Sequence, residues 1–361
     1  SGAIGYFSYD YGREHMGVPS AEQDVEPIPQ ARVLFYDLLF IEDCREKRVW
    51  LSACGQTEDA PALLARFRQD IARGMEEGFP PLPGAHAAKP IAVRPNFEKE
   101  EYKAAVDRMI RYIIEGDIYI ANMTQRLDVV SDREPLAVFE HLRTHNPSPF
   151  GAYLDCGDHQ IICASPERFL RLRGGVVETR PIKGTRKRGE TPEEDEALRW
   201  ELEQSEKDKS ELLMIVDLER NDLNRVCRPG SVEVTELFTV ETYATVFHLV
   251  SNIRGELAQG SGVTDLLRAA FPGGSITGAP KYRAMEIIDE LEHGKRGLYT
   301  GSIGYLTLDG ECDLNIVIRT AIHRDGRYHL GVGGGITSES DLEFEYEETL
   351  QKAKAVLEAL Q

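Results

Sequence analysis

Residues 301–337 have the sequence GSIGYLTLDGECDLNIVIRTAIHRDGRYHLGVGGGIT, in which apolar and polar side chains alternate around two Asp-Gly pairs. Such alternation is typical of half-buried strands, and Asp-Gly between two runs of this kind favours a tight hairpin turn. The stretch therefore predicts consecutive antiparallel strands. Predicted strands and helices elsewhere also come in blocks without alternating, which favours an α+β fold with antiparallel sheets over a doubly wound fold.

Apolar side chains at helical spacing, together with capping residues, predict the helices. The clearest helix lies between Asn96, which can cap its start, and Gly116, which can end it. A capping box formed by Thr191 and Glu194 begins another, which continues with a break to about Asn221. The others are expected over 60–76, from the end of GGSITGAP to about 294, and from Ser340, with Glu343 as its capping-box partner, to the C-terminus.

One stretch of low complexity, GFPPLPGAHAAKP at residues 78–90, predicts a linker or a long surface loop. We therefore divide the chain into residues 1–90, the N-terminal part of the fold, and residues 91–361, a larger domain that contains every candidate site residue discussed below. The first residues, SGAIGYFSYDYGREH, have the character of the interior of a domain. We expect further residues to precede them in the intact protein.

The composition excludes several classes of protein. A formal net charge of −19 over 361 residues argues against a general nucleic-acid binder, because no overall positive field would attract a polyanion. The six cysteines are widely spaced without a CxxC pair, which indicates neither a zinc site nor a disulfide framework. Reduced thiols are typical of a cytoplasmic protein. No apolar run reaches the roughly 20 residues of a membrane span.

The segment TRPIKGTRKRG, residues 179–189, contains five cationic side chains, one of which is Lys183. Such a strip can bind phosphate or position an anionic substrate, and a solvated loop explains it equally well. It can also hold a nucleophilic amine at Lys183. An amine attacks only when unprotonated, a form that Arg180 and Arg186 would favour if they point inward, as would desolvation.

Two pairs of acidic residues have the spacing of a shared helix face. Asp208 and Glu211 are three residues apart on a predicted helix, as are Glu345 and Glu348. Carboxylates on two helices can meet around a hard divalent cation such as Mg²⁺, which prefers oxygen ligands. Solvated helix faces are the simpler interpretation on spacing alone, since Glu348 with Lys352 is an ordinary i,i+4 pair.

Glycine-rich segments and one histidine complete the candidates. The run at 333–335, between a predicted strand and a predicted helix, can bring backbone N–H groups onto an anion or form a tight turn. FPGGSITGAPK at residues 271–281 opens a helix but lacks the Gly-Lys-Ser/Thr of a P-loop, so a smaller anion such as a carboxylate is expected. His248 stands in an apolar run, where a satisfied core histidine is the commoner case.

The chain contains, in this order, the motifs SPERF, RPIKGT, ELLMIVDLERNDLNRV, HLVS, FPGGSITGAPKYRAMEIIDELE, GSIGY, IRTA and GGGI followed by EFEYEETLQKA. Over essentially its whole length it resembles the chorismate-utilising enzymes, a family that includes anthranilate, isochorismate, salicylate and aminodeoxychorismate synthases. Members typically carry a further N-terminal segment. The resemblance implies antiparallel sheets in a β-sandwich flanked by helices, and makes residues 91–361 the chorismate-binding domain.

With Lys183 in RPIKGT, the chain resembles the aminodeoxychorismate synthase branch of the family, because anthranilate synthases generally have alanine at this position. That branch aminates chorismate at C4 with ammonia from a glutamine amidotransferase subunit, in para-aminobenzoate and folate biosynthesis. The resemblance implies that Lys183 attacks C2 of the ring and expels the C4 hydroxyl, which Glu167 protonates as general acid. Ammonia would then attack C4 and expel the lysine. Formation of anthranilate and pyruvate, as in component I of anthranilate synthase, is the alternative.

The resemblance also implies the binding residues. Mg²⁺ would bind the ring carboxylate of chorismate. An arginine fork suits the enolpyruvyl carboxylate, and His248 and Thr277 match an active-site histidine and a loop that approaches the substrate. The positions that match magnesium ligands are Glu211, Glu345 and Glu348, with Asp208 nearby. The positions that match contacts to the enolpyruvyl carboxylate are Tyr299, Arg319, Gly333, Gly334 and Gly335.

One departure from the family concerns the segment GDIYIANMT, residues 116–124, where members often have GDIYQVNL. Ile120 takes the place of the usual glutamine. In isochorismate and salicylate synthases this region supplies a lysine that activates water, which Ile120 cannot do. A non-catalytic subunit that only activates a glutaminase is a further alternative, which the intact Glu167, Lys183 and acidic positions disfavour.

Overall fold

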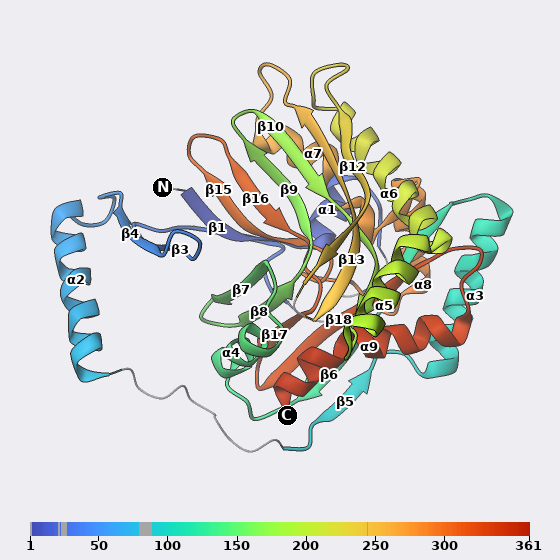
Figure 1. Ribbon diagram of the computed structural model, residues 1–361, viewed down its shortest axis with the longest axis horizontal. Coiled ribbons are helices and arrows are strands. Elements are labelled where there is room, and N and C mark those ends of the chain that lie inside the picture. Colours follow the sequence, from blue (N-terminus) through green and yellow to red (C-terminus); the bar gives the residue numbers. More distant parts are fainter. Residues whose placement is uncertain (1, 21, 23–26, 79–88, 244) are drawn as a thin grey trace.

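The computed structural model describes residues 2–20, 22, 27–78, 89–243 and 245–361 (Figure 1). Helices and antiparallel strands make up its elements, which confirms the expected α+β class. The helices are α1 (Tyr9–His15), α2 (Ala60–Glu77), α3 (Lys99–Glu115), α4 (Pro135–His145), α5 (Pro192–Gln204), α6 (Glu206–Asn224), α7 (Val263–Ala270), α8 (Lys281–Leu291) and α9 (Leu342–Leu360). The strands are β1 (Gly2–Phe7), β2 (Ala31–Phe35), β3 (Leu38–Asp43), β4 (Arg48–Ala53), β5 (Ala92–Pro95), β6 (Ile120–Val130), β7 (Phe150–Asp155), β8 (Gln160–Ser165), β9 (Arg168–Arg173), β10 (Val176–Arg180), β11 (Ile182–Lys187), β12 (Glu233–Thr242), β13 (Val246–Glu256), β14 (Gly278–Ala279), β15 (Ser302–Thr307), β16 (Cys312–Asn315), β17 (Thr320–Arg324) and β18 (Arg327–Ile336).

Two large antiparallel sheets form the centre of the molecule. The first has the strand order β11-β13-β10-β9-β16-β15-β1-β2, with β12 paired to β13. The second has the order β14-β6-β18-β17-β8-β7, with β5 paired to β6. Tyr6 and Ile303 of the first sheet and Ile161 and Ile322 of the second belong to one buried cluster. The two sheets therefore pack on each other, as expected for a β-sandwich.

Helices cover the other faces of both sheets (Figure 1). α6 and α7 pack on β9, β10 and β13 of the first sheet, in a cluster where Leu212 and Leu249 are fully buried. α4 and α9 cover β6, β8, β17 and β18 of the second sheet, where Leu330 and Val356 are fully buried. α3 and α8 pack beside β6 around Met123. The hydrophobic core is thus divided among sheet–sheet and helix–sheet layers.

The start of α3 differs from the prediction. Glu98, not Asn96, occupies the N-cap position, and its backbone N–H donates to the carboxylate of Glu101 at 3.0 Å. The side-chain oxygen of Asn96 instead accepts a hydrogen bond from the backbone N–H of Arg126 at 2.7 Å, so it serves the neighbouring strand. Gly116 ends the helix in the left-handed conformation at φ 88°, as predicted.

The other predicted helix starts are largely confirmed. Thr191 caps α5, and the expected break falls at Ser205, whose side chain caps α6. The cap of α9 is Asp341, one residue after the predicted Ser340, so the helix begins at Leu342. The Ser340 hydroxyl donates instead to the carboxylate of Glu345 at 2.7 Å, which ties the start of α9 to the candidate site.

The prediction that the triple glycine lies between a strand and a helix is wrong. Gly333, Gly334 and Gly335 are the last part of β18 before Ile336, and they pair with residues 122–124 of β6. The sheet ladder continues through them because β6 is long enough to accompany β18 to its end. Strand backbone without side chains therefore faces the space beside α9.

β3, β4 and α2 lie beside the rest of the molecule in Figure 1. β3 and β4 form a separate two-stranded sheet, and large apolar side chains there, such as Phe40 and Trp50, are exposed. Most of the predicted linker, residues 79–88, lies outside the described part of the chain. β1 pairs with β15, so residues on both sides of that linker share the first sheet. Among the described helices, none is long and apolar enough to cross a membrane.

Candidate active site

A cavity of about 910 Å³ collects residues from many elements that are distant in the sequence. Its walls come from β11, β13, the end of β18, α6, α9 and the segments that precede β9 and β17. The volume is within the range of small-molecule sites. All but one of the predicted site residues line it: Glu167, Lys183, Asp208, Glu211, His248, Tyr299, Arg319, Gly333, Gly334, Gly335, Glu345 and Glu348.

The amine of Lys183 lies against the glycine floor of this cavity. Its Nζ donates to the backbone carbonyl of Ser275 at 3.2 Å. A Cβ atom on Gly335 would lie 3.1 Å from Lys183 Nζ, 3.5 Å from a carboxylate oxygen of Glu211 and 3.7 Å from Cδ1 of Ile120. A larger residue at 335 would therefore occupy the space that brings the amine and the carboxylate together.

The cationic neighbours of Lys183 do not point at it. Arg180 forms ion pairs with Glu236 and Glu241, both at 2.7 Å. Arg186 pairs with Glu201 at 2.7 Å and with Asp208 at 3.1 Å. These guanidinium groups are expected to favour an unprotonated amine on the condition that they point inward, and their ion pairs show that this condition is not met. The basic strip is strand β11 and its flanks, with salt bridges to the surrounding helices and strands.

Glu167 is a buried carboxyl beside Lys183, 5% exposed. Burial raises the pKa of Glu167, while the Ser275 hydroxyl, which lies nearby outside hydrogen-bond geometry, and the Lys183 side chain lower it. The carbonyl of Glu167 accepts from the backbone N–H of Ile316 at 3.0 Å, which fixes the turn before β9. A carboxyl that retains its proton more readily than in water is suited to act as a general acid.

His248 is a neutral imidazole in this site. Burial lowers its pKa to about 4, and the nearby Arg319 adds to that effect. Its Nδ1 lies 2.9 Å from the hydroxyl of Thr185 on the neighbouring strand β11. The ring thus keeps one orientation and offers a hydrogen bond without a charge at pH 7.

Arg319 has the features of an anion-binding residue. It occupies the left-handed region at φ 49°, which turns its side chain into the cavity ahead of β17. Its guanidinium forms no ion pair with any carboxylate of the described residues, and burial lowers its pKa although Glu167 raises it. A half-buried arginine without a carboxylate partner is a natural site for the carboxylate of a ligand.

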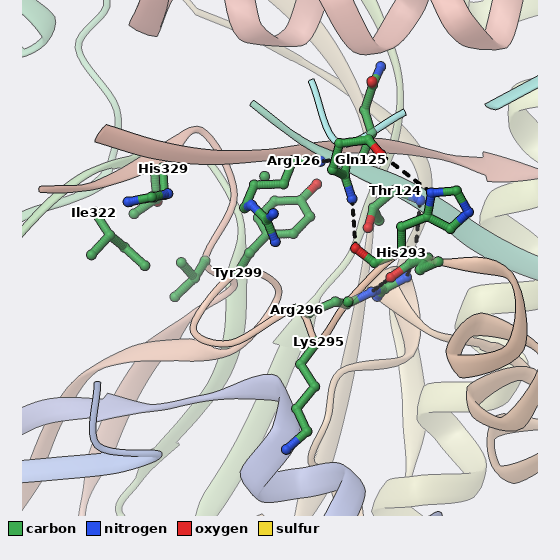
Figure 2. A pocket seen from close by; sticks show the side chains of 15 residues that line it. Thr124, Gln125, Arg126, His293, Lys295, Arg296, Tyr299, Ile322 and His329 are labelled. Carbon is green, nitrogen blue, oxygen red and sulfur yellow. Dashed lines mark hydrogen bonds and ion pairs between the residues drawn. The ribbon is translucent and has the colours of Figure 1, made fainter. Parts of the chain in front are cut away.

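Tyr299 forms the wall between this cavity and a smaller one. Its ring packs on Gly331, where a Cβ atom would lie 2.1 Å from the ring. Figure 2 shows the smaller cavity, of about 40 Å³, with Tyr299 between Arg126 and Arg296. The buried Arg296 holds this wall by an ion pair with Glu292 at 2.6 Å. Burial raises the pKa of Tyr299, so its hydroxyl is a proton donor at neutral pH.

The predicted magnesium ligands gather at the same glycine floor. A Cβ atom on Gly334 would lie 2.6 Å from a carboxylate oxygen of Glu348 and 3.2 Å from one of Glu345. Burial raises the pKa of Glu211 and of Glu345, and the charge of Glu348 raises that of Glu345 further. Solvated helix faces are therefore the wrong interpretation for Glu211 and Glu345, which are 8% and 2% exposed.

The donor chemistry of these carboxylates suits a hard cation, because buried acidic groups that repel one another are stabilised by added positive charge. Lysines supply that charge here: Lys352 pairs with Glu348 at 2.9 Å and Lys207 with Glu345 at 3.7 Å. No three His, Cys, Asp or Glu side chains among the described residues form a closed metal cluster. Magnesium at Glu211, Glu345 and Glu348 accordingly stays a prediction.

Two predicted residues play other parts in this structure. Asp208 lines the cavity, but its carboxylate is engaged by Arg186. Thr277 is buried next to the cavity without lining it, and its hydroxyl donates to the carbonyl of Gly273 at 2.8 Å. Substrate contact by Thr277 remains a prediction. Sequence reasoning missed Lys207 and Ser275, of which only Ser275 carried a signal, its place in the glycine-rich motif.

Comparison with known proteins defines the class. The family described as chorismate binding enzyme matches residues 1–358, and the chain belongs to this family. It is 41% identical over 368 residues to aminodeoxychorismate synthase component 1 of Bacillus subtilis, covering 100% of this chain and 77% of that protein. It is also 41% identical over 369 residues to anthranilate synthase component 1 1 of Haloarcula marismortui, covering 99% of this chain and 76% of that protein. The crystal structure of anthranilate synthase component I from Streptococcus pneumoniae superimposes with a TM-score of 0.88 at 32% identity, covering 98% of this chain and 80% of that one.

Proposed function

We propose that this protein aminates chorismate at C4, giving 4-amino-4-deoxychorismate for para-aminobenzoate and folate biosynthesis. The observation that carries the proposal is the position of Lys183, whose amine lies in the cavity against Gly335, beside Glu211 and Glu167. Relatives with two different names are equally similar in sequence, so identity does not distinguish them. The side chain at 183 supports amination, because an amine can form a covalent adduct with the ring, whereas the alanine that the resemblance assigns to anthranilate synthases cannot.

The proposed chemistry exchanges one ring substituent for another in two displacements. The lone pair of neutral Lys183 forms a bond to C2, the ring double bond shifts, and the C4 hydroxyl leaves with the proton of Glu167 as water. Ammonia then forms a bond to C4, the double bond shifts back, and the C2–N bond breaks to return Lys183. The new ammonium group at C4 then gives one proton to the Glu167 carboxylate, which restores the acid. The net change is chorismate and ammonia to aminodeoxychorismate and water.

The cavity offers separate partners for the two carboxylates of the substrate. Arg319, Tyr299 and the backbone of Gly333–Gly335 would bind the enolpyruvyl carboxylate. The Arg319 guanidinium pairs with no carboxylate in the part of the chain that the structure describes, and the Tyr299 hydroxyl is protonated. Glu211, Glu345 and Glu348 would hold Mg²⁺ at the ring carboxylate, where its charge draws electron density from the ring. Lys207 and Lys352 would then move away from the carboxylates that they now neutralise.

The apolar side chain of Ile120 and the neutral ring of His248 favour amination over hydrolysis in this proposal. Ile120 lies near the Lys183 amine and offers no group that activates water. His248 is neutral at pH 7, so it adds no positive charge that would stabilise a hydroxide. The ammonia would come from a glutamine amidotransferase subunit, which the designation component 1 of the relatives supports.

Product analysis tests the proposal. The protein is incubated with chorismate, Mg²⁺ and ammonium, and the products are separated by chromatography and weighed by mass spectrometry. An amino product that retains the enolpyruvyl group is expected, and Lys183→Ala should abolish it. Fluorescent anthranilate with free pyruvate would support the second candidate, anthranilate synthase, which the equally similar relatives favour.

A further inference from the structure

Glu219 is a buried carboxyl behind the candidate active site that the proposed chemistry does not use. It lies two turns after Glu211 on α6 and is 6% exposed, but it does not line the cavity. The hydroxyl of Thr179 on β10 donates to its Oε2 at 2.8 Å. A carboxyl of this kind is costly to bury and needs a compensating role.

The carboxyl joins two segments that place Lys183. Thr179 is on the strand that runs directly into Lys183 on β11. On the other side, Cγ of Glu219 lies 3.2 Å from the place of a Cβ atom on Gly274. The next residue, Ser275, accepts the hydrogen bond from Lys183 Nζ. α6, β10 and the glycine turn therefore meet at the Glu219 side chain.

The surroundings of Glu219 keep its proton in place. Burial raises the pKa of Glu219 to about 8; the Thr179 hydrogen bond lowers it, the charges of Glu167 and Asp222 raise it, and Lys281 lowers it. The amine of Lys281 is already bound to Asp222 at 2.6 Å and to the carbonyls of Ala270 and Pro272. The side chain is therefore mostly neutral at pH 7, so it adds no negative charge beside the carboxyl of Glu167 on the catalytic side.

We propose that Glu219 is a positioning residue for the reaction proposed above: its neutral carboxyl holds β10 and the Gly274 turn around Lys183, and its ionisation at alkaline pH makes Glu167 a weaker acid. A second buried negative charge near Glu167 disfavours the release of a proton from Glu167, because like charges at close range oppose a second ionisation. Ionised Glu219 would also draw solvent or a cation into the packing between α6 and the turn.

The pH dependence of kcat/KM for chorismate tests this role, with free ammonia held constant across pH. In the unaltered protein, activity should fall to a lower level as pH rises through about 8, because ionised Glu219 makes Glu167 a weaker acid. Glu219→Gln keeps the shape and the acceptor for Thr179 but cannot ionise, so its activity at pH 7 should stay within about threefold and the alkaline fall should move up by at least about one pH unit. Thr179→Val removes the hydrogen bond that lowers the pKa of Glu219, and should move the fall upward by less.

An alkaline fall at the same pH in Glu219→Gln and the unaltered protein would overturn the proposal, as would a fall that Thr179→Val moves to lower pH. If Glu219→Gln does not fold, the direction of the Thr179→Val shift still decides. A purely structural role would lower activity at every pH without moving the profile. The pH profile is measured by chorismate consumption, whichever product forms. The identity of the product tests the proposed function, so the role of Glu219 and the proposed function can fail separately.

An infrared difference spectrum supplies a readout without turnover. The carbonyl band of protonated buried carboxyls should decrease between pH 7 and 9 in the unaltered protein, and this decrease should be missing in Glu219→Gln. Glu167→Gln should keep the band, since Glu219 remains. A band that is present in Glu219→Gln with the same titration would assign it to another group and contradict the proposal.

Discussion

Gly335→Ala isolates the contact between the amine of Lys183 and the backbone of β18. The new Cβ atom would lie 3.1 Å from Lys183 Nζ, 3.5 Å from an oxygen of Glu211 and 3.7 Å from Cδ1 of Ile120. Gly335 is not among the glycines with positive φ, so alanine fits its backbone without strain. The substitution therefore acts through the neighbouring side chains, chiefly Lys183.

The expected effects on stability and activity differ in size. The crowded atoms are ends of flexible side chains that can move by a few tenths of an ångström, and alanine gains about 0.4–1 kcal/mol from the smaller entropy of the unfolded chain. Stability should thus change by less than about 1 kcal/mol. A nucleophile displaced by about 1 Å costs on the order of 10²-fold in rate, or about 2.7 kcal/mol of transition-state stabilisation.

Thermal unfolding and the rate of chorismate consumption measure the two effects. Gly262→Ala is the matched control, because a Cβ atom there meets no atom of the described residues within 4 Å. The control should keep activity, with a slightly lower melting temperature because Gly262 is the N-cap of α7. If Gly335→Ala folds and retains the activity of Gly262→Ala, the amine does not need its place against β18, and the reasoning about the glycine floor is refuted.

Three further perturbations have expected outcomes. Glu348→Gln should raise the Mg²⁺ concentration needed for half-maximal activity sharply with an unchanged melting temperature, and an unchanged requirement would contradict the proposed ligand. The free energy of unfolding of Glu219→Gln, relative to that of the unaltered protein, should be higher above pH 8 than near pH 4.5. This follows because a pKa raised from 4.5 to about 8 gives stability that is complete below 4.5 and is lost as pH rises through 8, with an upper bound of about 5 kcal/mol in urea unfolding. His248→Gln should leave the shape of the pH–rate profile unchanged between pH 5 and 7, since His248 is already neutral there; loss of an acidic limb near 6.5 would show a charged imidazole.

Local signals in the sequence were sufficient for the β15–β18 region and for several helix ends. The Asp-Gly turn at 325–326 joins β17 to β18, and Thr191 and Gly116 define helix ends, because each acts through neighbours a few residues away. The strand order could not be predicted, since β13 lies between β10 and β11 through pairings 59 to 80 residues apart in sequence. Asn96 failed as a cap because its oxygen serves β6.

The candidate site was predicted from motifs rather than from spacing. Spacing alone favoured exposed faces for Glu211 and Glu345, and their burial depends on the bare glycine strand that they face. The ion pairs of Arg180 and Arg186 were not predictable from spacing either, because their carboxylate partners lie 15 to 61 residues away in the chain. Glu219 gave no signal, since its role depends on a hydrogen bond from another strand.

Mass spectrometry of the protein after acid quench, with chorismate and Mg²⁺ but without ammonia, tests the central claim about Lys183 most directly. The predicted result is a peptide containing Lys183 that is heavier by chorismate minus water, and an unmodified peptide after ammonia is added. An unmodified Lys183 in samples quenched while chorismate is being converted to an amino product would contradict a covalent role for this amine.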